Sequence, residues 1–146
     1  MNIYIRWESH PINSLNFNSF SISMDFFVSE RRNQPVWVIG TRCRWLGFYL
    51  REDGTIALLY NNANFLNLRT NYFFNKWQNA KISYDGTKVN IFLDNSLAGS
   101  INTGNGYVSL DYETCGPTDT EIGVTNYSNG EVFKGYIRNL KVYNIQ

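Results

Sequence analysis

The stretch WQNAKISYDGTKVNIFLD, residues Trp77–Asp94, contains the two features that decide the fold. Apolar side chains occupy every second position on both sides of a central Asp-Gly pair: Ala80, Ile82 and Tyr84 before it, Val89, Ile91 and Leu93 after it. A period of two is typical of a strand with one buried face. Asp85-Gly86 favours a tight turn, because the central positions of such a turn need a positive φ. The stretch therefore predicts a β-hairpin.

The same pattern extends in both directions along the chain. Even positions of 20–28 are apolar, and the odd positions are polar except Phe27. Asp53-Gly54 separates two further apolar runs, Asp94-Asn95-Ser96 predicts a third turn, and 133–143 is again strand-like. No window has the helical period, so the sequence predicts an all-β sandwich or barrel. The longest loops are expected at 29–35, 61–75 and 102–132, where a rigid scaffold often carries its binding site.

Composition limits the class of protein. The chain has 146 residues and a mass of 17.0 kDa, which predicts a single domain over residues 1–146, alone or as one module of a longer protein. A net charge of +1 argues against a nucleic-acid partner. No apolar run reaches the roughly 18 residues of a membrane span, and residues 1–7 lack the apolar segment of a signal peptide. Cys43 and Cys115 could be bridged or free, and the sequence leaves both open.

Several motifs occur in a familiar order. An opening FSISMDFFV strand (20–28) is followed by VIG (38–40), the hairpin GFYLREDGTI (47–56), the Trp77–Asp94 stretch, EIG (121–123) and FKGYIRNLKVYN (133–144). Over roughly 15–144 this resembles the concanavalin A-like lectin/glucanase superfamily, especially its laminin-G-like and pentraxin-like branch. The resemblance implies a jelly roll of two antiparallel sheets with little or no helix. Asn95 stands where the branch usually has Gly, and residues 1–14 match no motif and are interpreted as an edge strand.

The resemblance implies a domain that binds carbohydrate or another extracellular ligand. Aromatic rings can stack on the C–H faces of sugars, and Asn and Arg offer planar groups to their hydroxyls. Five of the eight Arg lie within residues 31–51, which favours an acidic glycan as the ligand. The alternative is a solvent-exposed basic edge whose charge is balanced by Glu30, Glu52 and Asp53, and this would give the same sequence pattern. Trp77 and Tyr84 are expected to pack inside, and the side of Trp37 is ambiguous. The candidate ligand-binding residues are Arg42, Arg44, Trp45, Tyr49, Arg51, Tyr60, Asn62, Asn64 and Phe65.

Four acids in eleven residues form a candidate metal site: Asp111, Glu113, Asp119 and Glu121. A hard cation such as Ca²⁺ needs several oxygen ligands from converging loops, and laminin-G-like and pentraxin-like domains often hold Ca²⁺ at a rim. A solvated acidic loop is the alternative. No other cofactor is expected.

Catalysis has little support in the sequence. His10 is the only histidine, so a Ser-His-Asp or Cys-His site would depend on it entirely, and its local sequence offers no support for one. The Glu-x-Asp-x-x-Glu run of the superfamily's hydrolases does not occur. We therefore expect a non-catalytic, lectin-like module, extracellular or surface-exposed, with a glycan or glycoprotein as its partner. The alternatives are a laminin-G-like protein-binding or structural adhesion module that binds a receptor and, third, a glycan-active hydrolase.

Overall fold

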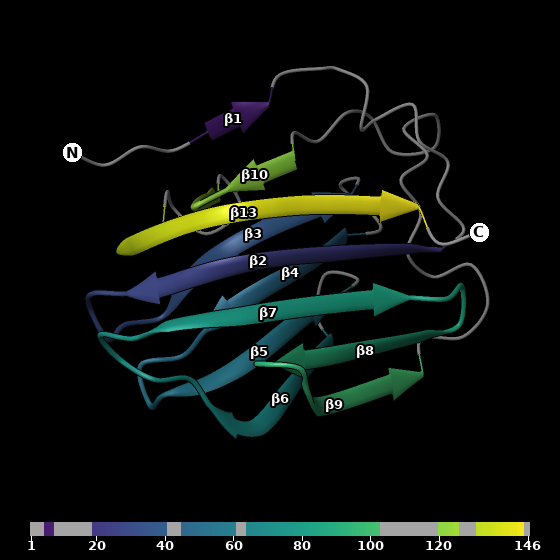
Figure 1. Cartoon of the computed structure of the whole chain (residues 1–146), viewed down its shortest axis with the longest axis horizontal. Helices are drawn as coiled ribbons and strands as arrows, with labels where there is room; N and C mark the ends of the chain where they lie inside the picture. Colours follow the sequence, from purple (N-terminus) through teal and green to yellow (C-terminus); the bar gives the residue numbers. More distant parts are fainter. Residues whose placement is uncertain are drawn as a thin grey trace.

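A computed structural model describes residues 5–7, 19–40, 45–60, 64–102, 120–125 and 131–144, and within these ranges it contains strands and turns but no helix (Figure 1). His10, Cys43, Cys115 and the Asn126-Tyr127-Ser128 sequon lie outside them. No helix in the described part is long and apolar enough to cross a bilayer. The strands are β1 (Ile5–Trp7), β2 (Phe20–Val28), β3 (Gln34–Gly40), β4 (Trp45–Leu50), β5 (Thr55–Tyr60), β6 (Asn64–Asn71), β7 (Trp77–Tyr84), β8 (Lys88–Leu93), β9 (Ser96–Asn102), β10 (Thr120–Ile122), β11 (Val124–Thr125), β12 (Glu131–Val132) and β13 (Gly135–Asn144).

The strands form two antiparallel sheets that pack face to face (Figure 1). We name the six-stranded sheet, in the order β1-β10-β3-β4-β5-β6, sheet A. The five-stranded sheet, in the order β13-β2-β7-β8-β9, is sheet B, and β11 and β12 form a separate small ribbon. This arrangement confirms the predicted two-sheet sandwich. Strand β1, from the segment interpreted as an edge strand, lies at the edge of sheet A.

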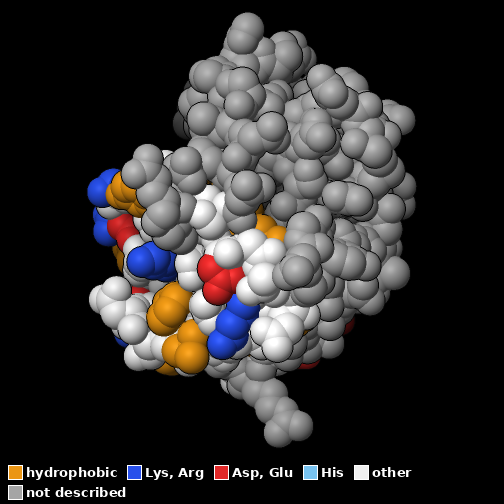
Figure 2. All heavy atoms as spheres, turned by 90° about the vertical axis from the view of Figure 1, so that its right-hand side faces the viewer, with side chains coloured by type: hydrophobic (Ala, Val, Ile, Leu, Met, Phe, Trp, Pro, Cys, Tyr) orange, Lys and Arg blue, Asp and Glu red, His pale blue; other side chains and the backbone are white. Residues whose placement is uncertain are grey.

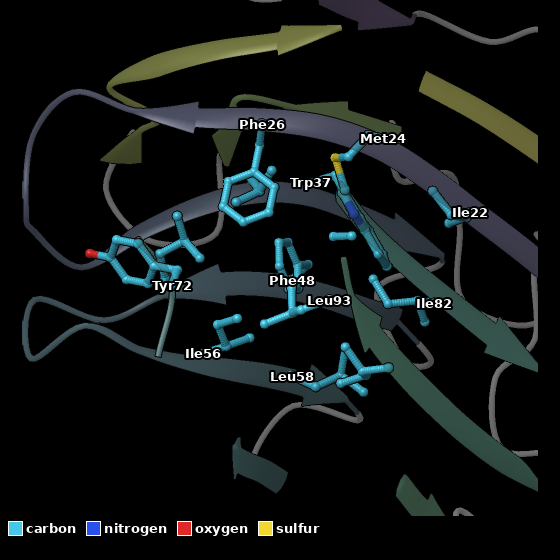
Figure 3. Close-up of a cluster of buried hydrophobic side chains, with 14 of the residues drawn as sticks. Ile22, Met24, Phe26, Trp37, Phe48, Ile56, Leu58, Tyr72, Ile82 and Leu93 are labelled. Carbon is cyan, nitrogen blue, oxygen red and sulfur yellow. The ribbon is translucent and has the colours of Figure 1, made fainter. Parts of the chain in front are cut away.

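The core lies between the sheets and follows the alternation read from the sequence. Even positions of β2 and β7, including Met24 and Ile82, face Phe48, Ile56 and Leu58 of sheet A (Figure 3). The ring of Phe48 meets Phe26 edge-on with 5.8 Å between centroids. It also stacks on Trp37 at 6.2 Å. Trp37 is therefore a core residue, which the sequence left ambiguous.

The turns take the conformations that their residues favour. Gly54 and Gly86 have φ values of 89° and 97°. Asp94 and Asn95 have φ values of 46° and 66°, so Asn95 supplies the positive φ that the branch usually obtains from Gly. At the first residue of the Asp85–Lys88 turn, the Asp85 carboxylate accepts hydrogen bonds from the backbone N–H groups of Thr87 (2.9 Å) and Lys88 (2.7 Å).

One predicted loop is wrong. Residues 61–75 were expected to be a polar, Asn-rich connection, but 64–71 form strand β6, which pairs with β5 from Tyr60↔Asn64 to Thr55↔Asn71. Pairing with an already anchored neighbour overrides the low strand propensity of asparagine. The end of the 29–35 loop is likewise strand, because β3 begins at Gln34, and the predicted 102–132 loop contains strands β10, β11 and β12.

Gln34 fixes two connections at one end of the sandwich. Its side chain is fully buried, and its Nε2 donates to the Glu30 carbonyl at 2.8 Å while its Oε1 accepts from the Lys134 N–H at 2.7 Å. Both ends of the carboxamide are therefore satisfied, as a buried amide requires. The contact joins the β2–β3 turn to the segment that precedes β13.

Asp25 ties three strands of sheet B together on the face that points away from the core. Its carboxylate accepts from Asn79 Nδ2 of β7 (3.0 Å) and from Asn139 Nδ2 (2.7 Å) and Arg138 Nε (3.3 Å) of β13. Asn139 has a φ of 53° and sits in the bulge between Arg138 and Lys141. The hydrogen bonds from Asn79 and Asn139 hold the pKa of Asp25 below its usual value, with a smaller contribution from Arg138.

Gly135 is expected to tolerate no side chain. A Cβ there would overlap the carbonyl oxygen of Phe27 and lie 2.9 Å from the ring of Phe133. Gly135→Ala should therefore lower the free energy of unfolding by about 1–3 kcal/mol, measured by urea denaturation. Gly99→Ala is the control, because its Cβ would overlap only the flexible tip of Leu68, which can rotate away. Equal losses for the two variants would contradict this account.

Stability is expected to depend on pH through Asp25. Because folding lowers its pKa, the ionised carboxylate stabilises the fold above the unfolded-state value near 3.8, and this contribution is lost as pH falls through the folded value. Asp25→Asn should thus melt below the parent at pH 7, with the gap narrowing as pH falls below 3.8, measured by circular dichroism. Glu52→Gln removes an equal charge from an exposed turn and should change the melting temperature little at pH 7. A gap for Asp25→Asn that is constant with pH would refute the assignment.

Candidate functional site

Tyr49 lies on the outer face of sheet A. It follows Phe48 and precedes Leu50, both buried in the core, so its side chain points the other way, and it is half-buried. In register it stands between Pro35 of β3 and Ala57 of β5, which are both buried. Its register partners on both sides are therefore buried residues.

Arg51 begins the turn that follows β4. Its N–H donates to the Thr55 carbonyl at 2.9 Å, and its own carbonyl accepts from the Gly54 N–H and the Tyr72 hydroxyl, both at 3.0 Å. The Asp53 carboxylate caps the turn, and hydrogen bonds from the Thr55 hydroxyl and N–H lower its pKa. The turn that carries Arg51 is thus internally braced.

The other candidate ligand residues divide into two groups. Four of them lie in three neighbouring strands of sheet A: Trp45, Tyr60, Asn64 and Phe65. Their backbones pair in register, Trp45 with Gly40, Tyr60 with Asn64, and Phe65 with Leu59. Arg42, Arg44 and Asn62 lie outside the described residues. The structure thus places Trp45, Tyr60, Asn64 and Phe65 at one end of strands β4–β6, and Tyr49 and Arg51 toward the other end of β4. It does not bring these six of the nine candidates together, and their role in binding stays a prediction.

The candidate calcium ligands are mostly outside the described ranges. Asp111, Glu113 and Asp119 lie in the undescribed 103–119 segment. The backbone of Glu121 lies in β10, paired with Arg6 of β1 and Val38 of β3. Within the described ranges, no three His, Cys, Asp or Glu side chains gather in a way that could hold a metal. Calcium binding stays a prediction.

The outer face of sheet B carries an aromatic row that the sequence analysis did not select. Tyr136, Phe27 and Trp77 are register partners on β13, β2 and β7. Their ring centroids are 5.9 Å and 5.7 Å apart, and Tyr136 is 64% exposed. Trp77, expected to pack inside, is only half-buried, whereas Tyr84 is in the core as expected. The available signal was Phe27, the one apolar residue among the polar odd positions of 20–28.

Polar and charged groups occupy the next register row. Arg138, Asp25 and Asn79 are partners across β13, β2 and β7. The Arg138 guanidinium lies over the Trp77 ring, with its central carbon 4.0 Å from the ring centroid, and 56% of its side chain is exposed. A rigid aromatic row therefore lies beside a guanidinium, a carboxylate and two carboxamides.

Two further exposed rings lie between β6 and β7. Phe73 is 54% and Phe74 is 38% exposed. Lys76 Nζ lies 4.8 Å from the Phe73 centroid and the Arg31 guanidinium 5.8 Å from that of Phe74. Phe74 forms a bridge with Val28 at the end of β2, next to Phe27 of the aromatic row. The backbone of Phe74 is thus placed beside the end of β2.

The opposite end of the sandwich has a different character. Figure 2 looks at the right-hand end of the view in Figure 1, and the described side chains there mix basic, acidic and hydrophobic groups. They form no large patch of a single kind in the part that is described.

A scan against protein-family models and a search of curated proteins found no match to this sequence. Solved structures do match. A putative carbohydrate binding protein from Bacteroides ovatus superimposes with a TM-score of 0.73 at 17% identity, covering 97% of this chain and 41% of that one. The CBM40 of Ruminococcus gnavus IT-sialidase, bound to α2,3-sialyllactose, gives a TM-score of 0.70 at 12% identity, covering 89% and 78%.

Domains LG4-5 of the mouse laminin α1 chain give a TM-score of 0.70 at 10% identity, covering 97% of this chain and 38% of that one. The chain thus spans about two fifths of the length of the Bacteroides and laminin structures. At these identities the likeness shows the fold alone. The chain has the jelly-roll sandwich fold that the laminin G and CBM40 domains share, as its motifs predicted.

Proposed function

We propose that the chain is a non-catalytic carbohydrate-binding module that acts outside the cell or on a surface, with a glycan or glycoprotein as its partner. The observation that carries this proposal is the set of aromatic rings left on the outer sheet faces beside planar polar groups. Tyr136, Phe27 and Trp77 form a row next to Asp25 and Arg138.

Such a surface suits a sugar better than a flat apolar partner. The C–H faces of a pyranose can lie on aromatic rings, while its hydroxyls need donors and acceptors in fixed positions. Asn79 and Asn139 are held by the Asp25 carboxylate, so their orientation is set before a ligand arrives. Preorganised polar groups lose little entropy on binding.

The structural neighbours agree with this choice of ligand class. One is named a putative carbohydrate binding protein, and another was solved with sialyllactose. A shared fold does not by itself transfer a ligand, so the proposal depends on this chain's own rings and polar groups.

We extend the proposal to acidic glycans on sheet A. Tyr49 and the braced Arg51 turn belong to the described part of the arginine-rich segment 31–51, and Arg42 and Arg44 belong to the same segment. A guanidinium can pair with a carboxylate through two parallel hydrogen bonds.

The described carboxyl groups suit a binding module better than a glycan-active hydrolase. In the described ranges the carboxyl groups with a shifted pKa are Asp25, Asp53 and Asp85, and hydrogen bonds lower all three. A general acid for glycoside hydrolysis needs the opposite shift.

The adhesion alternative is favoured by Phe73 and Phe74. These two rings lie side by side in sequence on an exposed connection. Exposed apolar groups of this kind often mark a protein contact. Under this alternative the chain would bind a protein surface through the end of the sandwich that carries Phe73 and Phe74.

A glycan array tests the proposal directly. The purified chain is expected to bind a subset of glycans, with acidic members preferred. Tyr49→Ala and the double variant Arg42→Ala/Arg44→Ala should each weaken binding to the acidic members about tenfold, because a ring contact or a charge-assisted pair is lost. Tyr49→Phe keeps the ring and should bind almost as well as the parent. A folded chain that binds no glycan would refute the proposed function, and unchanged binding by both variants would remove the site from sheet A.

Calcium binding is tested on the same protein. If Asp111, Glu113, Asp119 and Glu121 hold Ca²⁺, millimolar calcium should raise the melting temperature, because a ligand that binds only the folded state stabilises it. Replacing Asp119 and Glu121 by Asn and Gln should abolish that shift, whereas Glu52→Gln should preserve it. A melting temperature that is the same in calcium and in chelator would contradict the site.

A further inference from the structure

We propose that Arg138, on the outer face of sheet B, binds the carboxylate of an acidic sugar such as a uronic or sialic acid residue, and that Tyr136 contacts the ring of that sugar. The inference rests on the proposed carbohydrate-binding function. It adds a second acidic-sugar site, on the sheet opposite the one that carries Tyr49 and Arg51.

The guanidinium of Arg138 is immobilised from two directions. One face lies on the Trp77 ring at 4.0 Å from its centroid, and Nε donates to Asp25 Oδ2 at 3.3 Å. An unrestrained arginine loses considerable rotamer entropy when it binds, and this arginine has already lost much of that freedom.

The terminal nitrogens of Arg138 remain available. Within the described residues the structure gives Arg138 one ion pair, through Nε to Asp25, and more than half of its side chain is exposed. Two parallel N–H donors on a planar group match the two oxygens of a carboxylate, which is also planar. The fixed fork therefore favours a carboxylate over a neutral hydroxyl.

The surrounding charges permit an anion at this position. Asp25 is the nearest acid, and its carboxylate already accepts hydrogen bonds from Asn79, Asn139 and Arg138. On the other side, Lys141 of β13 and Lys81 of β7 flank Ser23 in the next register row. Asp94 lies further away, beyond Asn79, whose backbone N–H donates to it at 2.8 Å.

Tyr136 supplies the ring contact. It is the most exposed member of the aromatic row and lies two residues before Arg138 on the same face of β13. A pyranose lying on this ring could place its carboxylate near the guanidinium, since alternate residues of a strand are about 7 Å apart. The hydroxyl and amide groups of neighbouring residues would face the sugar's hydroxyls.

The test uses an oligogalacturonate and the same oligosaccharide after chemical reduction of its carboxyl groups. The Tyr49→Ala chain is used throughout, so that the sheet A candidate does not obscure the result, and affinity is measured by isothermal titration calorimetry. We expect the acidic form to bind at least tenfold more tightly than the reduced form. Adding Arg138→Met should abolish that preference, and Arg138→Lys, which keeps the charge without the fork, should lose most of it. Adding Tyr136→Ala should weaken both forms.

Lys88→Met is the matched control. It removes one positive charge from the same sheet, at the distant Asp85–Lys88 turn, and should leave the preference unchanged. A preference that survives Arg138→Met in a protein with parental circular dichroism would overturn this inference while leaving the proposed function intact. Equal losses for Lys88→Met and Arg138→Met would also overturn it, because net charge alone would then explain binding. If neither oligosaccharide binds the Tyr49→Ala chain but the parent binds glycans on the array, the site on sheet B is refuted and the proposed carbohydrate-binding function stands. If the parent binds no glycan in any format, both proposals fail.

Discussion

Interleaving of apolar side chains between two sheets is the constraint on which the rest of this molecule depends. At the centre, Phe26 of sheet B meets Phe48 of sheet A edge-on, and Phe48 stacks on Trp37 of its own sheet. Because a strand alternates its side chains, burying one set turns the other set to the opposite face of the sheet. The outer face of sheet B can therefore carry polar, charged and aromatic groups without weakening the core. This division explains how one short chain can combine a stable sandwich with several exposed rings.

The fold could be predicted from local sequence because its signals are local. Alternation in 20–28 and 77–93, with Asp-Gly or Asp-Asn at the turns, is sufficient to place β2, β7, β8 and their connections. Strand β6 was missed because its asparagines are poor strand formers, and its pairing with β5 is a tertiary effect. Trp37 stayed ambiguous for a related reason: a register shift between Pro35 and Trp37 alters the alternation, and a short apolar run does not reveal such a shift.

The candidate sites were less accessible to sequence reasoning. Tyr49 and Arg51 could be selected because they alternate with Phe48 and Leu50 within one hairpin. The row of Tyr136, Phe27 and Trp77 joins residues separated by more than a hundred positions, and only the register between β13, β2 and β7 brings them together. The same holds for Arg138, whose partners are Asp25 and Trp77. Sequence alone gives the composition of such a surface but not its layout.

The bulge between Arg138 and Lys141 also has a consequence for the behaviour of the protein in crowded surroundings. Strand β13 is an outermost strand of sheet B, and a long regular edge strand would offer its free backbone groups to a second chain. The break in regularity, the left-handed Asn139 and the flanking Arg138 and Lys141 make that edge a poor template for continued pairing. This edge of sheet B therefore does not favour pairing with the sheet of a second copy of the chain.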